Sequence, residues 1–266
     1  MNRDWPGEGP VGDVEPVDPT APPLRRPRIM RQDWRDLTFV HWAVDPGRVA
    51  PFMPPGVRPD VHEGATYVGL VPFRMVDAGL PHGPPVPWAG TFLETNVRLY
   101  SVDSTGRRGI VFRSLDTDRA LVVAGARMVF GLPYRWGRLR HSCRSSAGGE
   151  EHTYEARLRH RGVWGASSRV VVKVAEPVAA TALDDFLLSR WGLHVAHLGR
   201  SWYVPNSHPS WDLRRAELTS LDDDLVRSVG LGKLAERSPD HVAFSSGVHA
   251  EFGLPIRADT PRPTSR

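Results

Sequence analysis

The sequence predicts an α+β protein built on a mainly antiparallel sheet that curls toward a barrel. Three observations lead to this fold class. Many short segments are rich in β-forming residues, only two or three segments show a helical pattern, and turn residues are frequent, with 25 glycines and 25 prolines among 266 residues. A sheet that closes on itself would leave few exposed edges.

The two ends of the chain differ from the middle in composition. Residues 1–28 are rich in Pro, Gly, Asp and Glu and lack periodic hydrophobicity, so they predict a disordered leader. Residues 257–266 predict a second disordered tail. Residues 29–256 are then expected to form a single domain, a size that one chain of this length can support.

The first half of the predicted domain alternates strands with proline-rich connections. Residues 36–44 predict a strand, and residues 45–56 predict a short helix with proline in its first turn. Residues 66–76 predict another strand, in which Pro72 indicates either an edge position or a bulge. The Gly/Pro-rich segment 77–90 is long enough for a lid or a rim.

The clearest strand spans residues 91–100 and pairs as a hairpin with residues 110–115. Leu93, Thr95, Val97 and Leu99 share one face, which is typical of an ordinary core. The opposite face is amphiphilic and suits either water or a polar cavity. Its members are Phe92, Glu94, Asn96, Arg98 and Tyr100.

The second half adds short helices and further strands. Residues 119–130 predict a helix that ends at Gly131, with Pro133 preventing its continuation. Thr181 and Asp184 form a capping-box pattern at the start of a helix that runs to Arg190. The remaining predictions are strands at 152–159 and 167–175, a hairpin at 192–205, a helix at 221–229 and a bulged strand or strand pair at 241–252.

Composition argues against several classes of function. The net charge is +4, and the arginines are spread along the chain, so we expect no nucleic-acid partner. There is no secretory signal and no stretch long and apolar enough to span a membrane, which predicts a cytoplasmic protein without a membrane partner. The single cysteine, Cys143, excludes an internal disulfide and lies in a polar stretch that predicts a turn. The sequence leaves a homo-oligomer open.

Metal and cofactor motifs are also missing from the sequence. His194 and His197 would lie on opposite faces of a strand, which is poor geometry for one metal ion. No glycine-rich nucleotide motif and no Gly-x-Ser-x-Gly elbow is present. We therefore expect no metal and no cofactor, and we expect a small molecule as the partner.

Several segments together resemble a known family. The chain is similar to the YqjF-like family of unknown function in the acetoacetate decarboxylase-like superfamily, over nearly all of the sequence from Trp34 to Phe252. The segments that carry the resemblance are residues 39–44, 68–73, 92–100, 112–116, 131–134, 208–213 and 245–248.

The resemblance implies a cone-shaped β-barrel with a buried central pocket. In the decarboxylase, two adjacent lysines follow the helix and its proline stop, and the first forms a Schiff base with the keto acid. Here Tyr134 and Arg135 take those positions. By position, Glu94 matches a pocket glutamate and Arg35 a pocket arginine. A second pocket glutamate has no counterpart, because its position near Leu70 is apolar.

The chemistry that remains is independent of an imine. Tyr134 cannot form an imine, so the resemblance predicts a pocket protein that differs from a standard acetoacetate decarboxylase. The predicted catalytic residues are Glu94, Tyr134 and Arg135, and the predicted substrate-binding residues are Arg35, Asn96 and Arg98. They suit an organic acid or carbonyl compound and a lyase or isomerase reaction. A non-catalytic metabolite-binding or protein-interaction role is the alternative, and Glu94 and Arg98 could instead pair with cross-strand partners.

Overall fold

The computed structural model describes residues 13–87, 90–120, 131–146 and 149–260, and most of them lie in strands. The strands are β1 (Arg28–Val44), β2 (Val57–Pro59), β3 (Thr66–Gly79), β4 (Phe92–Asp103), β5 (Arg108–Thr117), β6 (Tyr134–Ser146), β7 (Gly149–Leu158), β8 (Ser167–Pro177), β9 (Gly192–His197), β10 (Arg200–Ser207), β11 (Leu213–Asp223), β12 (His241–Gly253) and β13 (Ile256–Arg257). The helices are α1 (Pro46–Val49) and α3 (Ala182–Leu188), with short helical turns at Ala50–Phe52, Arg227–Leu231 and Leu234–Glu236.

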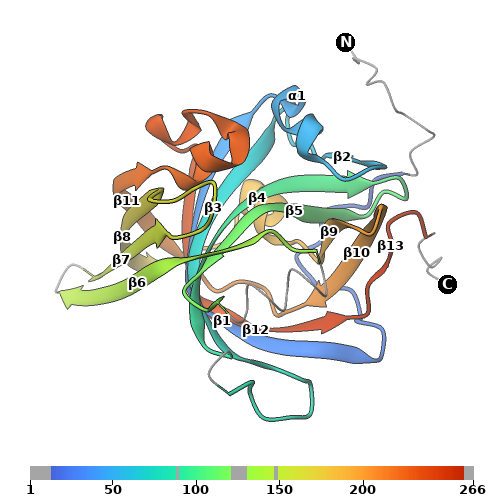
Figure 1. Cartoon of the computed structure of the whole chain (residues 1–266), viewed down its shortest axis with the longest axis horizontal. Helices are drawn as coiled ribbons and strands as arrows, with labels where there is room; N and C mark the ends of the chain where they lie inside the picture. Colours follow the sequence, from blue (N-terminus) through green and yellow to red (C-terminus); the bar gives the residue numbers. More distant parts are fainter. Residues whose placement is uncertain (1–12, 88–89, 121–130, 147–148, 261–266) are drawn as a thin grey trace.

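The described strands form one sheet that closes on itself. Their order is β13-β10-β9-β5-β6-β7-β8-β11-β12-β1-β3-β4-β2, and the additional pairs β4–β5 and β10–β12 join its distant parts. All pairs are antiparallel except β5–β6 and β5–β9. Figure 1 shows β6, β7, β8 and β11 on one side of the molecule and β9, β10 and β13 on the other. The predicted α+β class with a curled, mainly antiparallel sheet is confirmed.

Strands β12, β1, β3, β4 and β5 form a shared wall with a hydrophobic core on each face. The first core includes Val97 and Leu99 of β4 and is completed by side chains of β6, β7, β8 and the helical turns after β11. The second core includes Phe92 and Tyr100 and is completed by α3, β9 and β10. Because side chains alternate along a strand, β4 supplies both cores from one stretch of sequence.

The pairing of β1 with β3 contains a bulge beside Pro72. Arg35 pairs with Arg74 and Val40 with Leu70, so β1 uses one more residue than β3 over this stretch. The extra length includes Asp36, whose φ of 54° lies in the left-handed region. Proline has no N–H for the sheet, which explains the local loss of regular pairing. Strand β3 lies between β1 and β4, so the bulge alternative is confirmed and the edge alternative is wrong.

Other local predictions agree with the structure. The hairpin of β4 and β5 forms in antiparallel register. The capping box of α3 is complete, since Thr181 accepts from the Asp184 backbone and Asp184 accepts from the Thr181 backbone. The hairpin predicted at 192–205 forms from β9 and β10 and turns at Leu198 and Gly199, both with positive φ.

Three local predictions need correction or fall outside the described residues. Cys143 lies in the long strand β6 rather than in a turn, although it is exposed and free as expected. The helix predicted at 221–229 is wrong at its start, because β11 continues to Asp223. Cross-strand pairing with β8 overrides the local helical pattern there. The helix predicted at 119–130 lies almost entirely outside the described residues.

Described residues of both predicted tails make contacts with the domain. Of the leader predicted at 1–28, the part from residue 13 lies against the domain: Glu15 donates its backbone N–H to the Gly106 carbonyl, and the Trp191 indole donates to the Asp18 carbonyl. Ala258, in the predicted tail, is buried. The disorder expected for the two tails stays a prediction beside these contacts. The domain boundaries themselves stay a prediction.

Candidate functional site

The inner face of β4 that borders the second core carries a row of buried polar side chains. Glu94, Asn96 and Arg98 are 3%, 5% and 9% exposed, and Tyr100 is fully buried. Side chains two residues apart on a strand point to the same face at intervals of about 6.8 Å. The polar face that the sequence identified is therefore directed into the protein rather than toward water.

Glu94 and Tyr134 form the first polar pair on this face. The Tyr134 hydroxyl donates to Glu94 Oε2 at 2.9 Å, and Asn96 Nδ2 lies 3.5 Å from Glu94 Oε1. Burial raises the pKa of the Glu94 carboxyl to about 7, although both hydrogen bonds act in the opposite direction. Burial, together with the nearby Glu94, also raises the pKa of Tyr134, so the phenol stays protonated. Glu94 is thus poised to exchange a proton near neutral pH.

Arg98 is a buried cation without a carboxylate partner among the described residues. Its Nε donates to the Tyr100 hydroxyl at 3.1 Å, and its Nη2 lies 3.5 Å from the Leu187 carbonyl. Its guanidinium carbon lies 5.4 Å from the centre of the Phe39 ring. Buried charges are usually paired, so this guanidinium can accept an anion from outside the chain.

Gly69 makes room for Arg98 to meet His41 across β3. His41 of β1 and Arg98 of β4 both pair with Gly69. A Cβ at Gly69 would lie 3.0 Å from His41 Cδ2 and 3.1 Å from Arg98 Cγ. Because glycine lacks this atom, Arg98 Nη2 approaches His41 Nε2 to 3.5 Å.

A chain of hydrogen bonds leads from Arg98 toward the surface. The Tyr100 hydroxyl lies 2.7 Å from His41 Nε2, His41 Nδ1 lies 2.9 Å from His241 Nδ1, and His241 Nε2 lies 2.8 Å from Asp184 Oδ1. Burial, with the nearby His241, Arg98 and Arg190, holds the pKa of His41 well below its usual range. One direction of donation satisfies every member of the chain: Arg98 to Tyr100 to His41 to His241 to Asp184.

Two of the six predicted site residues lie elsewhere. The Arg35 side chain is 43% exposed and pairs with Asp33 at 3.2 Å, so the predicted position in the pocket is not observed. Arg135 forms a buried ion pair with Asp116 at 2.5 Å and donates to Ser228 at 2.8 Å. It follows Tyr134 directly on a strand, and neighbouring side chains point to opposite faces.

The structure adds residues that the motifs did not single out. His41, His241 and Asp184 come from β1, β12 and the first turn of α3, and they meet only in the folded chain. Period-two alternation within residues 36–44 would have placed His41 on the same face as Phe39, but nothing in the sequence pairs it with His241. Asp184 was identified only as a helix cap, and it fills both roles with its two oxygens.

Neither lysine of the chain lies at the site. The sequence contains only Lys173 and Lys233. Lys173 is exposed on β8, and the Lys233 side chain is 75% exposed beside Glu236. Over the part of the chain that the structure describes, there is no group of three or more metal-ligating side chains, and no helix is long and apolar enough to cross a membrane.

Known proteins of similar fold include decarboxylase-like enzymes. An acetoacetate decarboxylase-like enzyme from Sphingomonas wittichii RW1 superposes with a TM-score of 0.61 at 14% identity, over 87% of this chain and 93% of that one. The enduracididine biosynthesis enzyme MppR in complex with pyruvate gives 0.59 at 17% identity, over 95% and 99%. Acetoacetate decarboxylase from Legionella pneumophila gives 0.58 at 13% identity, over 86% of each chain. These similarities establish the acetoacetate decarboxylase-like fold.

Sequence comparison identifies the family. Residues 31–249 match the DUF2071 family, described as uncharacterized conserved proteins. The YqjF protein of Bacillus subtilis (strain 168), also described as uncharacterized, is 31% identical over 193 residues, which cover 71% of this chain and 76% of that protein. The chain belongs to the DUF2071 family.

Proposed function

We propose that this DUF2071 protein binds a small organic acid or carbonyl compound on the inner face of β4 and catalyses proton transfer on it without forming an imine. The observation that carries this proposal is Glu94: a buried carboxyl whose pKa is raised to about 7 and which accepts a hydrogen bond from Tyr134. A carboxyl with a pKa near the working pH suits a general acid–base catalyst.

Arg98 supplies the binding half of the proposal. A guanidinium that is buried without a carboxylate partner among the described residues suits the carboxylate of an organic acid. The chain of hydrogen bonds through Tyr100 and His41 fixes its Nε, while its Nη atoms make only long contacts. Binding of pyruvate by MppR, which shares the fold, supports an oxo acid as the ligand class.

The spacing of these residues constrains the ligand. Glu94 and Arg98 lie four residues apart on one strand, a distance of about 13 Å between Cα atoms. Arg98 extends toward Tyr100, the side away from Glu94. A ligand whose carboxylate contacts Arg98 while its reacting carbon reaches Glu94 must therefore be extended. We expect an oxo acid longer than pyruvate to fit best.

The reaction that this site supports is enolisation, the first step of many lyase and isomerase reactions. The Glu94 carboxylate takes a proton from the carbon beside the ligand carbonyl, the C–H electron pair forms the new C=C bond, and the π pair of the carbonyl moves onto its oxygen. The Tyr134 hydroxyl and the Asn96 amide donate to Glu94 in the structure, and once Glu94 has taken the proton these donors can turn to the enolate oxygen and stabilise it. Glu94 then returns its proton to the same or another carbon, so the enzyme ends unchanged.

Deuterium exchange tests this function. Proton NMR in heavy water would follow loss of the C–H signal beside the carbonyl in oxo acids of increasing chain length, from pyruvate upward. We expect Glu94→Gln to abolish exchange while preserving binding, measured by thermal shift, and Arg98→Gln to weaken binding. Binding without exchange by the unaltered protein would show a metabolite-binding protein instead of an enzyme. No thermal shift with any acid would contradict both.

Borohydride trapping tests the absence of an imine. With acetoacetate and borohydride, we expect the protein mass to remain unchanged, because one lysine is on β8, the other is beside Glu236, and both are exposed. A mass increase located on Lys173 or Lys233 would contradict the imine-free mechanism.

A further inference from the structure

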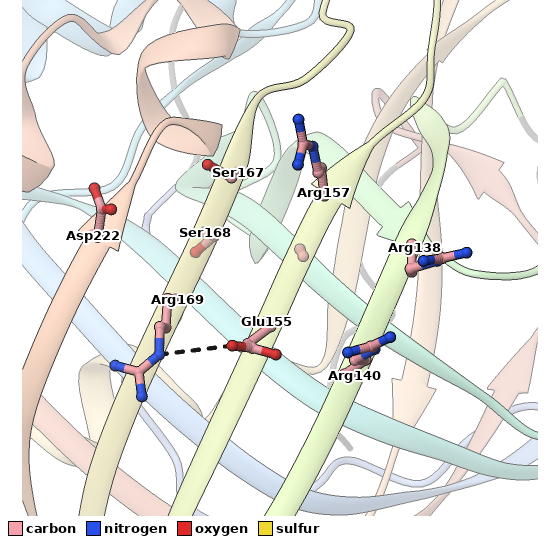
Figure 2. Close-up of a pocket in the computed structure, with 9 residues that line it drawn as sticks. Arg138, Arg140, Glu155, Arg157, Ser167, Ser168, Arg169 and Asp222 are labelled. Carbon is pink, nitrogen blue, oxygen red and sulfur yellow. Dashed lines mark ion pairs between the residues drawn. The ribbon is translucent and has the colours of Figure 1, made fainter.

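A hollow lies on the outer face of β6, β7, β8 and β11, separate from the row of residues on β4. Its volume is about 350 Å³. Figure 2 shows the side chains around it: Arg138 and Arg140 come from β6, Arg157 from β7 and Arg169 from β8. Four guanidinium groups therefore surround one small depression in the surface.

The strand register brings like charges together at this hollow. Arg138 pairs directly with Arg157 across β6 and β7. Like charges in directly opposed positions destabilise a sheet. The neighbouring pairs on the same face are complementary: Arg140 opposes Glu155, which opposes Arg169, and Arg144 opposes Glu151, which opposes Lys173. The mismatch is confined to the pair of Arg138 and Arg157.

Three of these guanidinium groups have no ion-pair partner in the part of the chain that the structure describes. Arg169 pairs with Glu155 at 3.7 Å, and this is the ion pair drawn in Figure 2. Over the described residues, the side chains of Arg138, Arg140 and Arg157 make no ion pair and no hydrogen bond. Their fifteen or so N–H donors are free for a ligand.

We propose that this hollow binds a small phosphate-bearing anion. Arginine forks match the geometry of phosphate oxygens, and two or three forks together suit a group with more than one negative charge. The anion would offset the repulsion between Arg138 and Arg157. The site is small because Glu155 on β7 lies between Arg140 and Arg169, and Asp222 on β11 borders the hollow beyond β8, so a longer polyanion would meet carboxylates.

Calorimetric titration of the full chain with pyrophosphate at low salt tests the proposal. We expect saturable binding that Arg138→Gln and Arg157→Gln each weaken by about tenfold, which corresponds to ~1.4 kcal/mol. Glu155→Gln should tighten binding, since it removes a negative charge beside the site. The matched control is Arg215→Gln, which makes the same change of charge at an exposed pair with Glu176 outside the hollow. It should leave binding unchanged.

Three results would overturn the proposal. One is the absence of pyrophosphate binding by the unaltered protein. Another is equal weakening by Arg157→Gln and Arg215→Gln, which would mean diffuse electrostatic attraction. The third is stronger binding of citrate or of a single-stranded oligonucleotide, with affinity that grows with length in the latter case, because the site would then not select a small phosphate group. None of these results depends on the reaction at β4.

Discussion

At the scale of single residues, Glu94 is the most informative position in the chain. It was identified by its place on one strand face, and folding gives it a chemical character that the sequence does not contain. Its hydrogen-bond partner Tyr134 lies on β6, forty residues later in the sequence, and both side chains are buried. Burial raises the pKa of Glu94, and this single change makes acid–base chemistry feasible near pH 7.

Glu94→Gln should change the pH dependence of stability. The pKa of Glu94 is about 7 in the folded protein and 4.5 for an ordinary glutamate. Between these values the folded state holds a proton that the unfolded state has lost, so stability falls as pH rises through this window. Glutamine does not titrate, so the Glu94→Gln variant does not lose stability in this way as pH rises. In urea unfolding we expect it to match the unaltered protein at pH 4.5 and to be about 3 kcal/mol more stable at pH 8.

The exposed Glu217→Gln serves as the control for that experiment, and it should track the unaltered protein at both pH values. If Glu94→Gln destabilises the protein equally at both pH values, Glu94 is an ordinary structural carboxylate.

Gly69→Ala should disturb the Arg98 site from the neighbouring strand. The new methyl group would lie about 3.0 Å from the His41 ring and must push it or Arg98 aside. Overpacking of this kind costs roughly 1–3 kcal/mol, measured by urea unfolding. Gly83→Ala, where the methyl would meet Leu80 Cβ at 3.6 Å, is the matched control and should be nearly neutral. Equal unfolding midpoints for the two variants would show that the side chains of His41 and Arg98 can move aside for the new methyl group without loss of stability.

At the scale of elements, α3 connects helix capping to the polar chain. Asp184 caps the helix through Thr181 and also accepts from His241, while the carbonyl of Leu187 in the same helix faces Arg98. Seven residues of helix therefore hold both ends of the chain of hydrogen bonds.

Thr181→Ala should loosen this element. Losing the cap is expected to cost about 1 kcal/mol in urea unfolding, whereas Thr181→Ser keeps the hydroxyl and should retain most of the stability. Because the bond between Thr181 and Asp184 helps to orient Asp184, thermal shifts by oxo acids should also shrink in Thr181→Ala. Unchanged stability in both variants would mean that packing of Phe186 and Leu187 alone holds α3.

At the scale of the whole molecule, the closing pairs β4–β5 and β10–β12 turn one sheet into a wall with two cores. The candidate reaction site lies on the face toward the second core, and the arginine hollow lies on the outer face of strands that enclose the first. Two sites of different chemistry can therefore coexist without sharing a residue.

Deletion of residues 1–27 should destabilise the domain. It removes the contacts of Glu15 with Gly106 and Arg108 and of Asp18 with Trp191. At roughly 1 kcal/mol for each hydrogen bond, the expected loss is about 2–4 kcal/mol, seen as a lower Tm. Deletion of residues 1–12 keeps all of these contacts and is the control. Equal Tm values for the two deletions would support a leader that is disordered as far as residue 28.

The sequence by itself determined the fold class, the family resemblance and the polar face of β4. These depend on local periodicity, turn residues and short motifs, which act over a few neighbouring positions. The same local reasoning missed β6 and β11 as strands, because their polar sequences gain strand structure only from pairing with β7 and β8.

Only the tertiary structure decided which polar residues meet. Positional matching placed Arg35 and Arg135 beside Glu94, yet one lies on the surface with Asp33 and the other is turned to the opposite face by strand alternation. His41, His241 and Asp184 join the site from three separate elements. Burial, pKa shifts and unpaired guanidinium groups are properties of that three-dimensional arrangement, because they depend on which atoms exclude water from which charges.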